Sequence, residues 1–126
     1  MSYNIDTWKT KKIDNLTMPL SALYEISEDL GRRGWRPDRP QIMEDGSVVI
    51  SLGESEIKGR LANGILSVSE IDISGEGSGI YLEGILKPAL KRSKGKLTAV
   101  LVWEGGDSVN RMTVEDGEVT EEEIDL

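Results

Sequence analysis

The chain has 126 residues, 30% of them charged, and its 23 acidic residues outnumber the 15 basic ones to give a net charge of −8. It contains neither cysteine nor histidine, which excludes disulfides, thiolate or imidazole zinc sites, and nucleophile–histidine catalysis within the chain. Any catalysis would rest on carboxylates, lysine, tyrosine or hydroxyl groups, so a binding protein is the first expectation.

The length fits one domain over residues 1–126. The sequence has no run of about 18 apolar residues, the length that spans a bilayer. Its opening, "MSYNIDTWKTKK", lacks an apolar signal-peptide core. We therefore expect a cytoplasmic protein with no membrane partner. One glutamine and four asparagines are few thermolabile side chains, a composition typical of proteins from hot environments.

The first part of the chain predicts a strand followed by a helix. Residues 4–13 form a weak strand. Apolar residues at helical spacing then predict a helix over 19–33, with Thr17 or Met18 as its cap and Gly34 as its stop.

A run of hairpins follows this helix. Alternating apolar residues predict strands at 48–52, 57–61 and 65–73. Asp45-Gly46 and Asn63-Gly64 are dipeptides favoured in two-residue turns. Near Ser69 the alternation changes phase, which predicts a β-bulge.

A second, basic helix follows the glycine-rich stretch Gly75–Gly79. Glu83 and Lys87 are spaced as an i,i+4 ion pair. Pro88 removes a helical hydrogen bond and crowds the preceding turn, so we expect a kink there.

The last elements are strands. Residues 97–103 are apolar on both faces, as in a strand at the centre of a sheet. A hairpin over 108–124, turning at Asp116-Gly117, closes the chain. Its acidic end, a hairpin or tail at about 115–126, predicts a solvated face. The alternative is a surface that mimics a polyanion, or that docks a basic partner or the protein's own basic patch.

Together these elements predict an α+β fold with a mainly antiparallel sheet and two helices packed on one face. The expected order is β-α-β-β-β-β-α-β-β-β. The element order of the front portion, β-α-β(4)-α, resembles the TATA-binding-protein-like arrangement, a resemblance that supplies no function.

We expect a small non-catalytic binding, interaction or regulatory module without a cofactor. Its partner would be another protein or a second copy of the chain. A homodimer is plausible because the second face of strand 97–103 requires cover. An enzyme is the less favoured class, since the sequence holds no strong catalytic motif.

One alternative function is nucleic-acid binding by the Arg/Trp-rich segment 32–39 together with the basic helix 87–96. Arginine pairs with phosphate, and an aromatic ring stacks on a base. The net charge of −8 opposes this function. In the competing interpretation the basic residues complement helix C-terminal dipoles and Trp35 covers the edge of the core. The candidate residues are Arg32, Arg33, Trp35, Arg36, Arg39, Lys91, Arg92, Lys94 and Lys96.

A second alternative is a phosphate-ligand sensor or enzyme at the Gly75–Gly79 loop, because backbone N–H groups at a helix start attract anions. Gly77, Ser78, Gly79 and Lys87 are the candidate residues. The spacing matches neither the Walker loop nor the GxGxxG pattern. In the simpler interpretation Ser78 caps the helix and the glycines make the turn.

Glu104 and Asp107 flank a Gly-Gly pair and are weak candidates for a Mg²⁺ site. A glycine-permitted hairpin turn accounts for the same residues, so we expect no metal.

Overall fold

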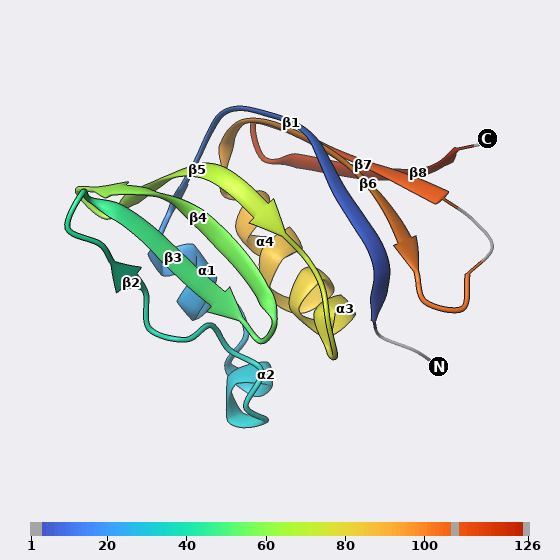
Figure 1. Ribbon diagram of the computed structural model, residues 1–126, viewed down its shortest axis with the longest axis horizontal. Helices are drawn as coiled ribbons and strands as arrows, with labels where there is room; N and C mark the ends of the chain where they lie inside the picture. The colour runs from blue at the N-terminus through green and yellow to red at the C-terminus, as the bar shows by residue number, and fades with distance from the viewer. Residues whose placement is uncertain (1–3, 107–108, 125–126) are drawn as a thin grey trace.

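The computed structural model describes residues 4–106 and 109–124. These residues form one eight-stranded antiparallel sheet in the order β2-β3-β4-β5-β1-β6-β7-β8 (Figure 1). The mainly antiparallel sheet with a few helices is confirmed. The strands are β1 (Ile5–Pro19), β2 (Gln41–Ile42), β3 (Ser47–Leu52), β4 (Ser55–Ala62), β5 (Ile65–Asp72), β6 (Lys94–Trp103), β7 (Val109–Glu115) and β8 (Glu118–Ile124).

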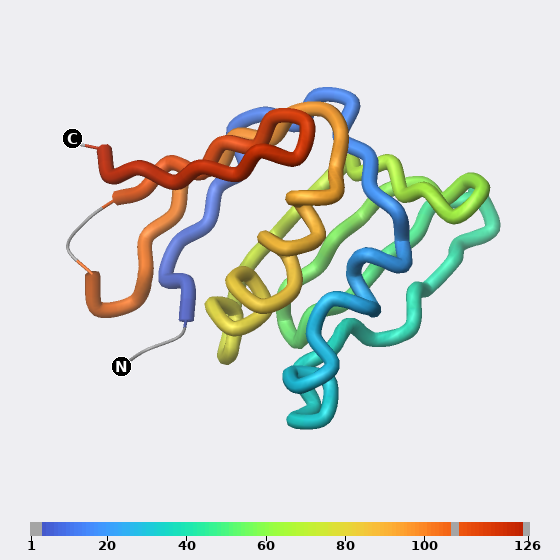
Figure 2. The backbone as a smooth tube through the Cα atoms, turned by 180° about the vertical axis from the view of Figure 1, so that it is seen from behind, coloured from blue at the N-terminus to red at the C-terminus, as the bar shows by residue number. Residues whose placement is uncertain are grey.

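The long strand β1 joins two halves of the sheet. It pairs with β6 from Ile5 to Thr17, but with β5 only from Thr17 to Pro19. Beyond this point β1 and β5 separate, and the helical segment that starts at Ser78 lies between the two halves (Figure 2). The expected strand over 4–13 was therefore too short.

The prediction of one helix over 19–33 is wrong, because the helix starts later and is divided in two. Residues up to Pro19 belong to β1, and the remainder divides into α1 (Ser21–Glu25) and α2 (Glu28–Arg32). Ser27 causes the division, because its side chain accepts a hydrogen bond from the Leu30 N–H and so starts a new helix.

The second helical segment has three consecutive parts: α3 (Ser78–Tyr81), the π-helix η1 (Leu82–Leu86) and α4 (Lys87–Leu90). The Lys87 N–H donates to the Leu82 carbonyl, five residues back. This wider turn lies just before Pro88, whose ring would crowd the carbonyl of Gly84 in a regular helix. Instead of the expected kink alone, the chain inserts a π-turn.

Ser69 is a bulge residue, as the phase change predicted. Lys58 pairs with Glu70 and Gly59 pairs with Val68, so Ser69 has no partner in β4. Turns occur at all three expected dipeptides, and both residues of Asn63-Gly64 have positive φ.

The core lies between the sheet and the helical segments. On β6 the side chains of Leu97, Ala99 and Leu101 are buried, whereas Val100 and Val102, on the opposite face, are half-buried. The apolar second face of this strand is thus largely, but not fully, withdrawn from solvent. In the part of the chain that the structure covers, no helix is long and apolar enough to cross a membrane.

Candidate functional site

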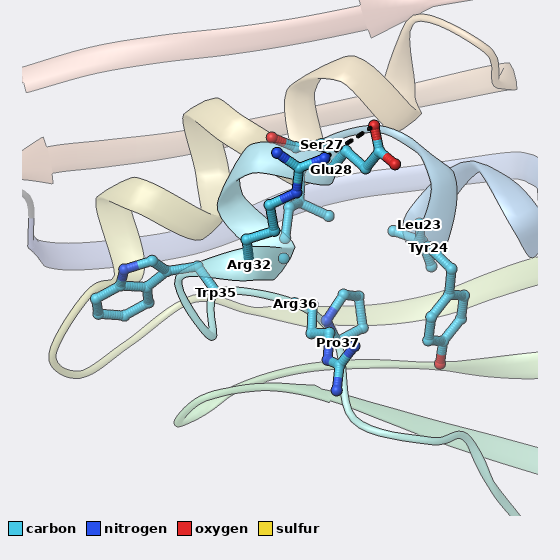
Figure 3. Close-up of a pocket in the computed structure, with 10 residues that line it drawn as sticks. Leu23, Tyr24, Ser27, Glu28, Arg32, Trp35, Arg36 and Pro37 are labelled. Carbon is cyan, nitrogen blue, oxygen red and sulfur yellow. Dashed lines mark ion pairs between the residues drawn. The ribbon is translucent and has the colours of Figure 1, made fainter.

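A groove lies between α1, α2 and the loop that follows them. One part of it is a cavity of about 320 Å³. A neighbouring hollow of about 420 Å³ shares Tyr24, Arg36 and Pro37 with it. We call the two together the 24–39 groove. In Figure 3, Tyr24 and Trp35 stand at opposite ends, with Arg32, Arg36 and Pro37 between them.

The loop is held against the sheet by backbone and side-chain hydrogen bonds. The Asp38 N–H donates to the Ser51 carbonyl at 3.0 Å, and the Tyr24 hydroxyl donates to the Asp38 carbonyl at 2.8 Å. Pro37 is buried, and α2 ends before it. Gly34, with a left-handed φ of 89°, turns the chain after α2 as the sequence predicted. Burial, and then the charge of Asp38, raises the pKa of Tyr24, so this hydroxyl remains a donor at neutral pH. The groove is therefore preformed by the chain itself.

Trp35 packs against the edge of the core and also lines the groove. Its ring is half-buried and meets the Tyr81 ring edge to face, with centroids 5.5 Å apart. It also lies against Gly77, where an added Cβ would come within 2.3 Å of the indole. These contacts fix the ring at one end of the groove.

Of the four arginines in residues 32–39, two form ion pairs with other described residues and two do not. Arg32 pairs with Glu28 at 4.0 Å and Arg33 with Asp29 at 3.5 Å, both across one turn of α2. Within the described ranges, Arg36 and Arg39 make no ion pair. Both line the hollow beside Tyr24, so two uncommitted guanidinium groups border the groove.

Trp35 and the basic residues 91–96 lie at opposite ends of the second helical segment. Trp35 contacts Gly77 at the start of the second helical segment, whereas Lys91 to Lys96 follow its end. The 13 helical residues between them correspond to about 20 Å. Arg92 and Lys96 also form ion pairs, with Glu25 at 3.9 Å and with Glu115 at 3.4 Å respectively.

In the Gly75–Gly79 loop, N–H groups expected to bind an anion donate within the chain. Gly77 donates to the Asn4 side chain at 2.7 Å, and Glu76 to the Glu54 carboxylate at 3.3 Å. Ser78 does not cap the helix. Its buried hydroxyl instead accepts the Ile5 N–H at 2.7 Å, and Gly77 occupies the cap position.

Lys87, the fourth anion candidate, lies in a polar cluster that sequence reasoning only half found. Its ammonium group donates to Glu83, as expected, and also to Glu121 of β8, each at 2.6 Å. Glu121 in turn accepts from Asn110 of β7 at 2.8 Å. Nothing in the run "EEE" distinguished Glu121 from its two neighbours.

The weak metal candidates gain no support. Glu104 is exposed, and Asp107 lies outside the described residues. Residues 4–106 and 109–124 contain no group of three acidic side chains that could hold a metal ion.

The comparisons with protein-family models, with curated proteins and with solved structures found no match.

Proposed function

We propose that this chain is a non-catalytic interaction module that binds an acidic segment of a partner protein in the 24–39 groove. The observation that carries the proposal is the lining of the groove by Tyr24, Trp35 and the arginines 32, 36 and 39. Tyrosine, tryptophan and arginine are the residues enriched at the energetic hot spots of protein interfaces.

Charge favours an acidic partner segment. Acidic residues exceed basic ones by eight in this chain, yet Arg36 and Arg39 have no carboxylate partner among the described residues. A guanidinium group binds a carboxylate through two parallel hydrogen bonds. Because Arg32 and Arg33 already have such partners, we assign the recognition to Arg36 and Arg39.

A nucleic-acid ligand has weaker support from the same geometry. The Trp35 ring meets Tyr81 edge to face, two of the four arginines are paired, and Arg92 of the second basic segment is paired with Glu25.

The test is a selection of displayed random peptides on the whole protein, followed by fluorescence anisotropy with the selected peptides. We expect them to carry at least two carboxylates. Replacing both Arg36 and Arg39 by Gln should weaken their binding by about tenfold or more, the effect of losing charge-assisted hydrogen bonds. The control is Arg111→Gln, an exposed arginine of β7 remote from the groove.

Selected peptides without acidic residues, or binding that survives the double substitution, would contradict the proposal. A single-stranded oligonucleotide that binds more tightly than every selected peptide would assign the groove to nucleic acid instead.

A further inference from the structure

A second groove, of about 520 Å³, opens on the face of the sheet opposite the helices, where β1 and β5 separate. It is independent of the 24–39 groove and shares no residue with it. The polar side chains that line it are those of Asn15, Thr17, Ser47, Arg60, Ser67 and Ser69.

Strand register places most of these side chains in one row. Ser47 of β3 pairs with Arg60 of β4, Arg60 pairs with Ser67 of β5, and Ser67 pairs with Thr17 of β1. Thr17 pairs in turn with Lys94 of β6. Directly paired residues project from the same face of a sheet, so two hydroxyl groups lie between two cations.

The local backbone explains why the groove is open. Pairing of β1 with β5 ends at Thr17 and Ser67, and the bulge at Ser69 bends β5 next to this point. Asn15 has a left-handed φ of 50°, a conformation that asparagine tolerates better than most residues. The two strands therefore diverge and leave a polar floor.

One part of the groove offers hydrogen-bond donors. Arg60 donates one of its five N–H groups to the Asp45 carbonyl at 2.7 Å, which fixes the guanidinium at the rim. In the part of the chain that is described, Arg60 and Lys94 have no ion pair. Arg60 and the hydroxyls of Thr17 and Ser67 line the groove, and Lys94 is paired with Thr17 just outside this lining. Together they are the donors that a phosphate group requires.

Two other hydroxyls are arranged as acceptors. Ser47 donates its proton to the Asp45 carboxylate at 2.6 Å, and Ser69 donates to the Lys58 carbonyl at 3.1 Å. Their oxygens can then accept hydrogen bonds from ligand hydroxyl groups. We propose that this groove binds a phosphorylated polyol of sugar-phosphate size. Its volume lies in the range of small-molecule sites and exceeds the need of a bare phosphate ion.

The test is a titration of the ¹⁵N-labelled protein with glucose 6-phosphate, inorganic phosphate and glucose, followed by NMR. We expect glucose 6-phosphate to shift the amide signals of Asn15, Thr17, Ser67 and Ser69, phosphate to bind more weakly, and glucose to have no effect. Arg60→Met should weaken binding of glucose 6-phosphate by about tenfold. The control Arg111→Met, at an exposed arginine of the other half of the sheet, should bind like the wild type.

Shifts outside this groove, or equal binding by Arg60→Met and the wild type, would overturn the proposal. So would the absence of shifts at about 20 mM glucose 6-phosphate, which nearly fills a site with a Kd of about 1 mM. Equal affinity for phosphate and glucose 6-phosphate would overturn the polyol assignment. The Arg36 and Arg39 substitutions should leave this titration unchanged, so the two proposals fail separately.

Discussion

At the residue scale, glycines decide how closely the loops approach the helical segment. Gly77 has a φ of 78° and lies against the Trp35 ring, whereas Gly34 has a φ of 89° and nothing within 4 Å of its Cβ position. At both positions the positive φ is unfavourable for any residue with a Cβ. Only at Gly77 would that Cβ also clash with a neighbouring side chain, the Trp35 ring. The wall of the 24–39 groove depends on this contact, because it fixes Trp35.

We predict that Gly77→Ala costs about 2–4 kcal/mol of unfolding free energy, the sum of a left-handed alanine and a clash with a rigid ring. Gly34→Ala should cost only the backbone term, about 1–2 kcal/mol. Chemical denaturation of both variants measures the difference. Equal losses in the two variants would show that the Trp35 contact does not restrict Gly77.

Some hydrogen-bond partners of single residues could not be predicted from the sequence. Ser78 was expected to be a cap because serine before an apolar run usually is one, but its partner is Ile5, 73 residues away. The Glu83–Lys87 pair was predictable because both residues lie on one helix, whereas Glu121 joins them from 34 residues away. Local spacing predicts local contacts, and tertiary partners require the topology.

At the element scale, β1 holds the two halves of the sheet together with side chains as well as with backbone pairing. Where β1 has left β5, the Thr10 hydroxyl donates to the Ile71 carbonyl at 2.9 Å. The Trp8 indole N–H is shared between that carbonyl, at 3.1 Å, and the Thr10 hydroxyl oxygen, at 3.0 Å. These bonds replace the ladder bond that this carbonyl would make in a continuous sheet. They hold β1 and β5 together beyond the point where their pairing ends.

Because the two donors share one acceptor, we predict that Trp8→Phe and Thr10→Val are strongly coupled. Either substitution alone leaves the Ile71 carbonyl with one partner, whereas the double variant leaves it with none and should cost about 1–2 kcal/mol more than the sum. Urea denaturation of the four proteins in the cycle gives this coupling energy, and the packing change at Trp8 cancels in it. Additive losses would mean that the carbonyl finds another donor.

Features of the helices and strands could be predicted from the sequence where a single effect, such as burial of one face of a strand, determines them. The bulge at Ser69 followed from the phase of Leu66, Val68 and Ile71, because burial of one face fixes register. The π-turn before Pro88 did not follow. Proline predicts that the helix must change, but packing on the sheet determines how. Likewise, the break at Ser27 was hidden because an amphipathic stripe continues through it.

At the scale of the whole molecule, the acidic end of the chain is part of the sheet up to Ile124. Strand β8 pairs along its length with β7. Its Glu121 is bound by Lys87 of the helical segment, with side chains only 22% and 16% exposed. This link ties the C-terminal hairpin to the core. The neighbouring pair of Arg111 and Glu122 lies on the exposed face.

The ion pair between Lys87 and Glu121 stabilises the folded protein over a pH range that the pKa values of the two groups define. Burial raises the pKa of Glu121, but hydrogen bonds and charge from Lys87, with hydrogen bonds from Asn110 and Trp103, outweigh it and the pKa is lowered. Burial lowers the pKa of Lys87, but Glu121 and Glu83 outweigh it and the pKa is raised. The stabilisation is therefore complete between about pH 5 and 9. It is lost as pH falls through the folded-state pKa of Glu121, or rises through that of Lys87.

We predict that Glu121→Gln costs about 1–3 kcal/mol at pH 7, because it leaves Lys87 with one carboxylate in a partly buried site. The difference from the wild type should shrink as the pH falls through the lowered pKa of Glu121, where the wild-type carboxylate also becomes neutral. Glu122→Gln, which removes an exposed pair on the same strand, should cost at most about 0.5 kcal/mol at pH 7. Denaturation between pH 3 and 8 measures all three proteins. A Glu121→Gln loss that persists undiminished at pH 3 would show that the carboxylate charge is not what holds β8 to the helix.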